Sequence, residues 1–187
     1  QIPFGMASDR FGRKPVIVFG LLVFAAGSFV AAATDDLVVT IVGRAIQGAG
    51  AISAAITALI ADSTRDSQRT KAMAMVGASI GLTFSLSLVG APLLYEAVGM
   101  GGIFAVTGLL ALAAIAVITL VTPAVPQAAA AAATQAGRTP FARIALDTDL
   151  LRLNFGIFTL HSAQMAMFVV LPTWLADRGG IALGDHW

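Results

Sequence analysis

The sequence predicts an all-α protein, a polytopic transmembrane helical bundle with five full spans. Composition is the first observation behind this prediction, because the 187 residues are 58% hydrophobic and only 11% charged, whereas soluble domains carry about 25% charged residues. The second observation is where the charges lie. All but one of the 11 Lys and Arg and the 10 Asp and Glu fall outside five long apolar stretches. This distribution is typical of a multi-pass membrane protein and disfavours a soluble globular one.

The five apolar stretches are each long enough to cross a bilayer as one helix. They cover residues 16–33, 37–61, 72–95, 103–121 and 153–176. At a rise of about 1.5 Å per residue, helices of roughly 18 to 25 residues cross a hydrocarbon core about 30 Å thick. A helix also satisfies its own backbone hydrogen bonds, which the lipid interior requires. We therefore expect one transmembrane helix from each stretch.

The basic residues of the connecting segments predict which side of the membrane each segment faces. Three Lys or Arg precede the first span, three lie between the second and third, and three lie between the fourth and fifth. The two short loops between these segments carry none, and the tail carries one. Because Lys and Arg accumulate on the cytoplasmic side, residues 8–15, 62–71 and 122–152 are expected inside and the other segments outside.

Residues 122–148 form the one long interruption between the predicted spans. They contain prolines and a tract of six alanines at 128–133, a composition that is typical of a spacer. We expect a cytoplasmic linker between two bundles, with residues 1–121 in the first bundle. Residues 149–187 are then the first helix of the second bundle and an outer loop. Because the chain starts at Gln1 and stops soon after a span, we expect a fragment of a longer protein.

Several other classes of protein fit the composition poorly. A net charge of +1 without a basic run gives no sign of a nucleic-acid partner. The sequence contains no cysteine, which excludes disulfides, thiolate metal sites and thiol nucleophiles. The predicted spans also lack the paired carboxylates or histidine clusters that a membrane-embedded enzyme would need. We expect no enzyme, no metal site and no cofactor.

A charged turn precedes the first span, at residues 5–15, Gly-Met-Ala-Ser-Asp-Arg-Phe-Gly-Arg-Lys-Pro. Gly5 would let a neighbouring helix approach closely, and Gly12 tolerates a positive φ. Pro15 suits the first turn of the next helix, and Asp9 can face a helix N-terminus. An ordinary positive-inside anchor, the simpler interpretation, would need only the basic residues.

One further acidic residue is expected near this turn. Asp62 ends the second span on the side that also carries Arg10, Arg13 and Arg69. A cluster of cytoplasmic ion pairs is therefore available, and if it formed in only one access state it would bias the equilibrium between states.

Arg44 is the one charge inside a predicted span. Placing it there costs at least roughly 2.5 to 3.5 kcal/mol on insertion scales, so it should face protein or a water-filled cavity. Gln47, three residues on, shares its helix face and can hydrogen-bond the guanidinium. The neighbouring Gly48 and Gly50 form a surface small enough for close helix packing. The alternative is a structural arginine that extends outward to the interface.

These two motifs resemble signatures of the major facilitator superfamily. Residues 5–14 are similar to the loop between that family's second and third helices, with Gly, three residues, Asp-Arg, one residue and Gly-Arg-Lys. Residues 44–50 resemble its fourth-helix motif, an Arg followed three residues later by Gln-Gly. The resemblance implies a partial major-facilitator fold. The five spans would be helices three to seven of twelve, residues 1–4 the end of helix two, and 1–121 part of the N-terminal six-helix bundle.

The resemblance also implies a conformational latch that holds the cytoplasmic side closed while the cavity faces outward. The candidate latch residues in this chain are Gly5, Asp9, Arg10, Gly12, Arg13 and Asp62.

The third span carries small residues and a proline, Gly81, Gly90 and Pro92. They resemble the fifth-helix signature of drug/proton antiporters, although Ala91 intrudes before the proline and the terminal glycines are missing. The alternative is a plain packing kink, since a proline frees a carbonyl and bends a helix.

The last span carries His161 and Gln164 near its middle, where secondary transporters place their binding sites. They are neighbours on one helix face. His161 could bind a polar substrate or accept a proton, or it could be a satisfied polar residue packed between helices.

Together with the resemblance, these features predict a secondary active transporter that works by alternating access. The leading expectation is proton-coupled efflux of small hydrophobic or drug-like molecules, with Arg44 altering the protonation of a nearby acid or water. If a carboxylate carries the proton, we expect it in a missing helix. The alternatives are an uptake carrier for a sugar, organic acid or other metabolite, and a structural or regulatory membrane protein. The expected partners are the lipid bilayer, a small-molecule substrate, protons and the rest of the chain. The expected location is the bacterial cytoplasmic (inner) membrane.

Overall fold

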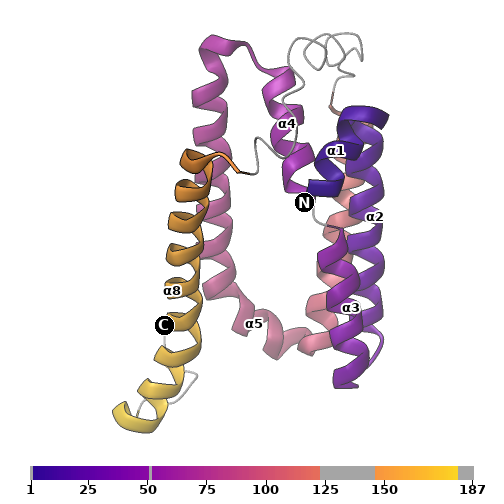
Figure 1. Cartoon of the computed structure of the whole chain (residues 1–187). Coiled ribbons are helices and arrows are strands. Elements are labelled where there is room, and N and C mark those ends of the chain that lie inside the picture. Colours follow the sequence, from indigo (N-terminus) through magenta and orange to yellow (C-terminus); the bar gives the residue numbers. More distant parts are fainter. Residues whose placement is uncertain (1, 51, 123–145, 181–187) are drawn as a thin grey trace. The chain divides into compact units, whose positions relative to one another are not determined.

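The computed structural model describes residues 2–50, 52–122 and 146–180, and every regular element among them is an α-helix. The helices, labelled as in Figure 1, are α1 (Ile2–Phe11), α2 (Arg13–Ala32), α3 (Leu37–Ala49), α4 (Ser53–Ser63), α5 (Asp66–Leu120) and α8 (Thr148–Gly179). Four stretches of this described chain are long and apolar enough to cross a membrane: Arg13–Ala32, Leu37–Ser63, Asp66–Leu120 and Thr148–Gly179. The prediction of an all-α bundle of membrane-spanning helices is confirmed.

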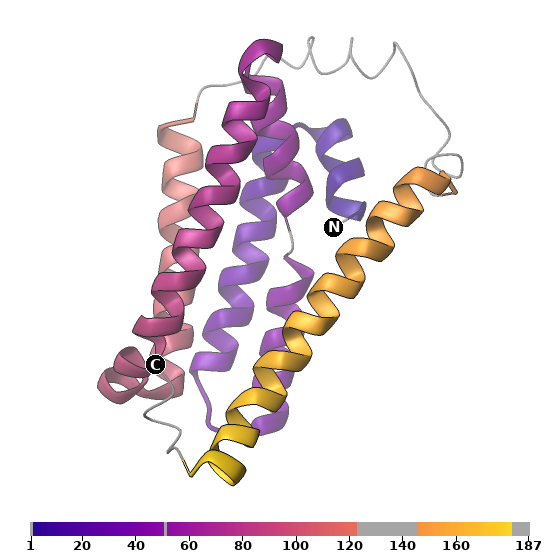
Figure 2. The same cartoon turned by 90° about the vertical axis from the view of Figure 1, so that its left-hand side faces the viewer.

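Helix α5 contains two spans rather than one. Its 55 residues would be about 80 Å long as a straight helix, far more than a bilayer needs. Gly99 interrupts it with a φ of 68°, a conformation that glycine adopts without the steric cost of a side chain. The chain turns there and runs back toward α2 (Figures 1 and 2). The short loop predicted between the third and fourth spans, at residues 99–102, is thus reduced to one non-helical residue, Gly99.

The second predicted span is present as the apolar stretch Leu37–Ser63, but it consists of two helices rather than one. Helix α3 ends at Ala49, where the Gly50 N–H donates to the Gln47 carbonyl at 3.2 Å, and α4 begins at Ser53. Glycine is a poor helix former and a common residue at helix ends. Gly50 is also pressed against α2, since a Cβ there would lie 2.4 Å from the Gly20 carbonyl oxygen.

The chain divides into two units, Gln1–Ala136 and Gly137–Trp187. The division falls inside the segment predicted as a linker, of which residues 123–145 lie outside the described part. The second unit contains α8, which Asp147 caps by accepting hydrogen bonds from two backbone N–H groups, and which ends at Gly180 with a φ of 64°. The outer loop predicted beyond it falls on residues 181–187, which are also outside the described part.

Within the first unit, α2 is the central helix and packs mainly against α3 and α5. At one end of α2, the Lys14 ammonium donates a hydrogen bond to the Thr122 carbonyl just after α5. At the other end, a Cβ on Gly101 would lie 3.0 Å from the Ala32 carbonyl oxygen. The second half of α5 is therefore antiparallel to α2, as the alternating charges of the connecting segments predict.

The core of this unit lies between α2 and α4. Four apolar residues there are buried: Ile17, Ile52, Ala55 and Leu59. By contrast, no residue of the first half of α5, residues 66–98, is buried within the described chain. That half presents its apolar side chains outward, as a helix facing lipid or further helices does.

Glycines allow α2 and α3 to cross with their backbones in contact. A Cβ on Gly27 would lie 2.4 Å from the Gln47 backbone nitrogen, and a Cβ on Gly43 would lie 2.8 Å from the Ala31 backbone nitrogen. Such crossings at small residues are a general feature of helix packing in membranes. Gly48, which the sequence placed on this packing face, instead borders open space within the described chain.

Candidate functional site

Arg13, the first residue of α2, joins α1, α2 and α4 at one end of the unit. Its Nε donates to Asp62 Oδ2 at 2.8 Å. Its Nη1 donates to Ser8 Oγ at 2.7 Å and also to Asp9 Oδ1. We call Ser8, Asp9, Arg13 and Asp62 the Arg13 cluster. The side chain of Arg13 is 16% exposed, against 27% for Asp62 and 48% for Asp9, so water reaches the carboxylates more readily than the guanidinium.

The local backbone explains how the Arg13 cluster forms. Gly12 has a φ of 94° and reverses the chain between α1 and α2, so that the start of α2 faces the last turn of α1. Ser8 is 2% exposed and donates its hydroxyl proton to the Gly5 carbonyl at 2.7 Å, which leaves its oxygen free to accept from Arg13. The predicted positive φ at Gly12 is confirmed. Gly5 is less constrained than expected, because a Cβ there would meet only the Ala54 Cβ, at an ordinary 3.6 Å.

Of the three arginines expected to pair with Asp62, only Arg13 does so within the described part of the chain. The Arg10 guanidinium instead lies 5.5 Å from the centre of the Phe11 ring, a cation–π arrangement. Arg69 pairs with Asp66 at 2.9 Å on its own helix and donates to the Ala61 carbonyl. The sequence predicted these arginines on the same side of the membrane as Asp62, but the geometry of the helices decides which of them pairs with it.

A second set of polar contacts links α3 to α2 inside the predicted spans. The Arg44 guanidinium donates to Gln47 Oε1, so the hydrogen bond expected from their spacing is present. Gln47 Nε2 then donates to Ser28 Oγ at 2.7 Å, and Ser28 Oγ donates to the Phe24 carbonyl at 2.9 Å. We call Arg44, Gln47 and Ser28 the polar chain. Arg44 is exposed, whereas Gln47 is 4% and Ser28 0% exposed.

Ser8 and Ser28 are the two partners that the sequence did not single out. Serine is common in apolar helices, where its hydroxyl bonds a carbonyl one turn back, and its presence alone therefore indicates nothing. The signal that could have found Ser28 is its position beside Gly27, because a small pair in a span often marks a helix crossing. Ser8 lies inside the charged turn and had no separate signal.

The antiporter-like residues of α5 lie in an open region of the described chain. A Cβ on Gly81 or Gly90 would meet no atom within 4 Å. Pro92 lies inside the helix, and the only non-helical residue of α5 is Gly99. The sequence offered a kink at Pro92 as one interpretation, whereas the helix is interrupted at Gly99. The role of Gly81, Gly90 and Pro92 in exchange stays a prediction.

In the second unit, His161 and Gln164 lie one turn apart on α8. His161 Nδ1 is 2.9 Å from the Ile157 carbonyl oxygen of its own helix, and its side chain is exposed while Gln164 is half-buried. Their place in a substrate cavity stays a prediction. No group of three or more His, Cys, Asp or Glu that could hold a metal ion occurs among the residues that the structure describes.

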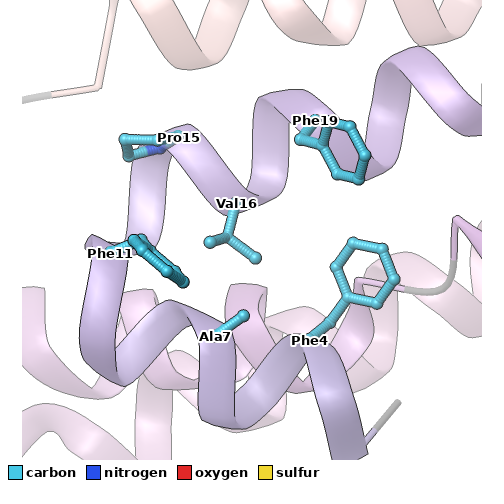
Figure 3. A pocket seen from close by; sticks show the side chains of 6 residues that line it. All are labelled: Phe4, Ala7, Phe11, Pro15, Val16 and Phe19. Atoms are coloured by element: carbon cyan, nitrogen blue, oxygen red, sulfur yellow. The ribbon is translucent and has the colours of Figure 1, made fainter.

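An open apolar hollow lies beside the Arg13 cluster, between α1 and the start of α2. It has a volume of about 390 Å³ and is lined by Phe4, Ala7, Phe11, Pro15, Val16 and Phe19 (Figure 3). The rings of Phe4 and Phe19 are stacked with centroids 6.3 Å apart. The charged contacts of the cluster and this apolar surface thus both involve α1 and the start of α2.

The profile of the Major Facilitator Superfamily matches residues 1–184, nearly the whole chain. The chain belongs to this superfamily. The two motifs that carry the resemblance supply Ser8, Asp9 and Arg13 to the Arg13 cluster and Arg44 and Gln47 to the polar chain, while Asp62 and Ser28 lie outside the motifs.

Among the relatives, two with full coverage of this chain are named as transport proteins and another is named as a resistance protein. The chain is 44% identical over 187 residues to the inner membrane transport protein YajR of Escherichia coli K12, covering 100% of this chain and 41% of YajR. It is 33% identical to an uncharacterized transporter of Buchnera aphidicola, covering 100% of this chain and 48% of that protein. A class B tetracycline resistance protein of Escherichia coli is 39% identical over 79 residues, 42% of this chain and 20% of that protein.

These matches have two consequences. The chain spans less than half the length of YajR and of the Buchnera transporter, so the activity of a whole transporter extends beyond the residues described above. The prediction of a multi-pass protein of the bacterial inner membrane is confirmed by the superfamily match, the apolar helices and the likeness to an inner membrane protein.

Proposed function

We propose that this chain is part of a secondary active transporter that exports small hydrophobic or drug-like molecules in exchange for protons, by alternating access. The observation that carries the proposal is the polar chain, in which an arginine inside a predicted span is held by neutral partners. A tetracycline resistance protein among the relatives supports export of a hydrophobic cargo. The open antiporter-like face of α5 is available for packing against further helices.

The polar chain supports proton coupling because of what it does to the charge of Arg44. Arginine stays protonated at any physiological pH, so it cannot carry the exchanged proton itself. A carboxylate partner would neutralise its field, but among the described residues Arg44 is held by the amide of Gln47. Its positive field therefore remains available to lower the pKa of a nearby acid or to orient water. The predicted spans contain no Asp or Glu, so that acid lies on another helix.

The Arg13 cluster is proposed as the latch on the cytoplasmic side. Arg13 binds carboxylates from two different helices, α1 and α4, so its contacts must change if those helices move relative to α2. Partly exposed ion pairs of this kind contribute about 0 to 1 kcal/mol each, enough in combination to shift a two-state equilibrium. Gly12 provides the turn that brings the partners together, while Gly5 and Arg10 are further members of the motif without a direct contact to Asp62 in the described chain.

Transport by the full-length protein in proteoliposomes tests the proposal. A lipophilic fluorescent cation should leave the cytoplasmic face only while a proton gradient is imposed, and Arg44→Gln should lower this flux by at least about tenfold if one charged hydrogen-bonding group is lost. Arg65→Gln, outside the span, is the matched control and should keep wild-type flux. Flux that survives collapse of the gradient would overturn proton coupling. Accumulation of a sugar or organic acid in place of export would favour the uptake alternative.

A further inference from the structure

In the polar chain each group donates a hydrogen bond to the next, from Arg44 to Gln47 to Ser28 and on to the Phe24 carbonyl. Ser28, which the sequence did not single out, sets this direction of donation. A guanidinium only donates hydrogen bonds, whereas the amide of glutamine has one accepting oxygen and one donating NH₂ group. Gln47 can therefore hold Arg44 only if its oxygen faces the guanidinium. Its NH₂ group must then point the other way, into the crossing of α3 with α2, and find an acceptor there.

Ser28 supplies that acceptor. Its oxygen lies 2.7 Å from Gln47 Nε2, and its own proton goes to the Phe24 carbonyl, 2.9 Å away. The hydroxyl is thus committed as a donor to the backbone and is left as an acceptor for Gln47. Ser28 is 0% and Gln47 4% exposed, so water cannot take the place of either partner without opening the crossing.

The glycine crossing fixes the distance between the two residues. Gly27 precedes Ser28, and a Cβ on Gly27 would lie 2.4 Å from the Gln47 backbone nitrogen and 2.6 Å from the Gly43 carbonyl oxygen. Because the backbones touch, the short side chain of serine reaches the Gln47 amide. A wider crossing would leave a gap between the hydroxyl and the amide.

We propose that Ser28 is a positioning residue for Arg44: it orients the Gln47 amide so that the amide oxygen, and not the NH₂ group, meets the guanidinium. The functional part of this inference rests on the proposed role of Arg44 in proton-coupled export. The structural part stands by itself, because it concerns only the contacts of Ser28, Gln47 and Arg44. Without the Ser28 hydroxyl, the Gln47 NH₂ group loses the acceptor that it has in the crossing, and the amide is no longer held with its oxygen toward Arg44.

A double-mutant cycle on the thermal stability of the full-length protein tests the structural part. Ser28→Ala and Gln47→Ala should each lower the Tm, and Ser28→Ala should have little further effect once Gln47→Ala is present, because residues in one network are not additive. Ser85→Ala is the matched control, since Ser85 also donates to a carbonyl of its own helix but lies in the exposed half of α5. Additive losses for Ser28 and Gln47 would overturn the inference whatever the transport activity.

Transport measurements test whether the orientation of the amide is what matters. Ser28→Ala should lower the rate of export by about tenfold, the factor for one buried hydrogen bond of about 1.4 kcal/mol, and should shift its pH profile in the same direction as Gln47→Ala. In a Gln47→Ala background no amide remains to be oriented, so Ser28→Ala should leave the remaining rate and the pH profile unchanged. An equal loss in both backgrounds would show that Ser28 acts only in packing. A wild-type protein without proton-coupled export would overturn the proposed function, while the Tm cycle would still decide the role of Ser28.

Discussion

The Arg13 cluster and the polar chain each hold an arginine next to α2, but the partners are carboxylates in the first and a neutral amide in the second. Arg13 lies at the end of a helix and binds two carboxylates that water can reach. Arg44 lies within a predicted span and is held by a neutral amide, which a fully buried hydroxyl supports. The first arrangement neutralises the charge and the second preserves it. The difference suits a latch in one place and a field acting on a proton in the other.

The two arrangements should also differ in strength and in their response to salt. Partly exposed ion pairs contribute about 0 to 1 kcal/mol and are screened at high ionic strength. Loss of a buried hydrogen-bond partner costs about 1 to 3 kcal/mol, because the remaining group is left unsatisfied, and salt does not screen it. The following predictions run from the largest expected effect to the smallest.

Gly27→Leu should have the largest effect. A side chain there would collide with the backbone of α3, since even a Cβ would lie 2.4 Å from the Gln47 nitrogen. The crossing would open and the Ser28 contact with Gln47 would be lost with it. We expect little or no folded protein in the membrane, measured by accumulation and by the Tm in detergent. Gly81→Leu, at an open position of the described chain, is the control and should accumulate better. Equal accumulation of both variants would contradict the close crossing.

Arg13→Ala should be the next most disruptive change. It removes two partly exposed ion pairs, to Asp9 and Asp62, worth about 0 to 1 kcal/mol each, and it also removes the hydrogen bond to the buried Ser8 hydroxyl, whose loss costs about 1 to 3 kcal/mol. The Tm of the full-length protein should fall measurably. Arg10→Ala removes only the contact with the Phe11 ring and should cost about 0.5 to 1 kcal/mol, as exposed cation–π pairs do. An Arg10→Ala loss as large as that of Arg13→Ala would show that the cluster is not centred on Arg13.

Asp9→Asn should affect transport more than stability. Insertion should stay intact, because the turn at Gly12 does not depend on this carboxylate, while export falls as the proposed latch weakens. Transport and membrane abundance are measured on the same preparation. Asp66→Asn is matched in chemistry, and in the described part of the chain Asp66 pairs with Arg69 on its own helix, so this variant should keep wild-type transport. Wild-type flux from a well-expressed Asp9→Asn protein would remove the latch role.

Salt should produce the smallest effect and separate the two arrangements most directly. The Tm difference between wild type and Asp62→Asn should shrink from low salt to 1 M salt, where the Debye length is about 3 Å. The difference between wild type and Ser28→Ala should stay constant over the same range. Parallel behaviour of the two variants would mean that the clusters do not differ in the way their exposure indicates.

The sequence predicted much of the fold and part of each site. The apolar stretches located every span, and the neighbouring positions of Arg44 and Gln47 on a helix predicted their hydrogen bond. The same reasoning placed Arg10, Arg13 and Arg69 near Asp62 but could not choose among them, since the choice depends on how α1 turns at Gly12. It also missed Ser28, because a serine in an apolar helix has no distinctive pattern until another helix crosses it.

Hydropathy was enough to determine that this chain is a helical membrane protein, because the cost of transferring a residue into lipid is local and sums along the chain, and the count of basic residues predicts which segments face the cytoplasm. The break between α3 and α4, the turn reduced to Gly99, and the partners of Arg13 and Gln47 were decided only by tertiary structure. Each depends on backbones that approach within van der Waals contact, as at Gly27 and Gly43. Such distances arise between segments far apart in sequence, and no local pattern contains them.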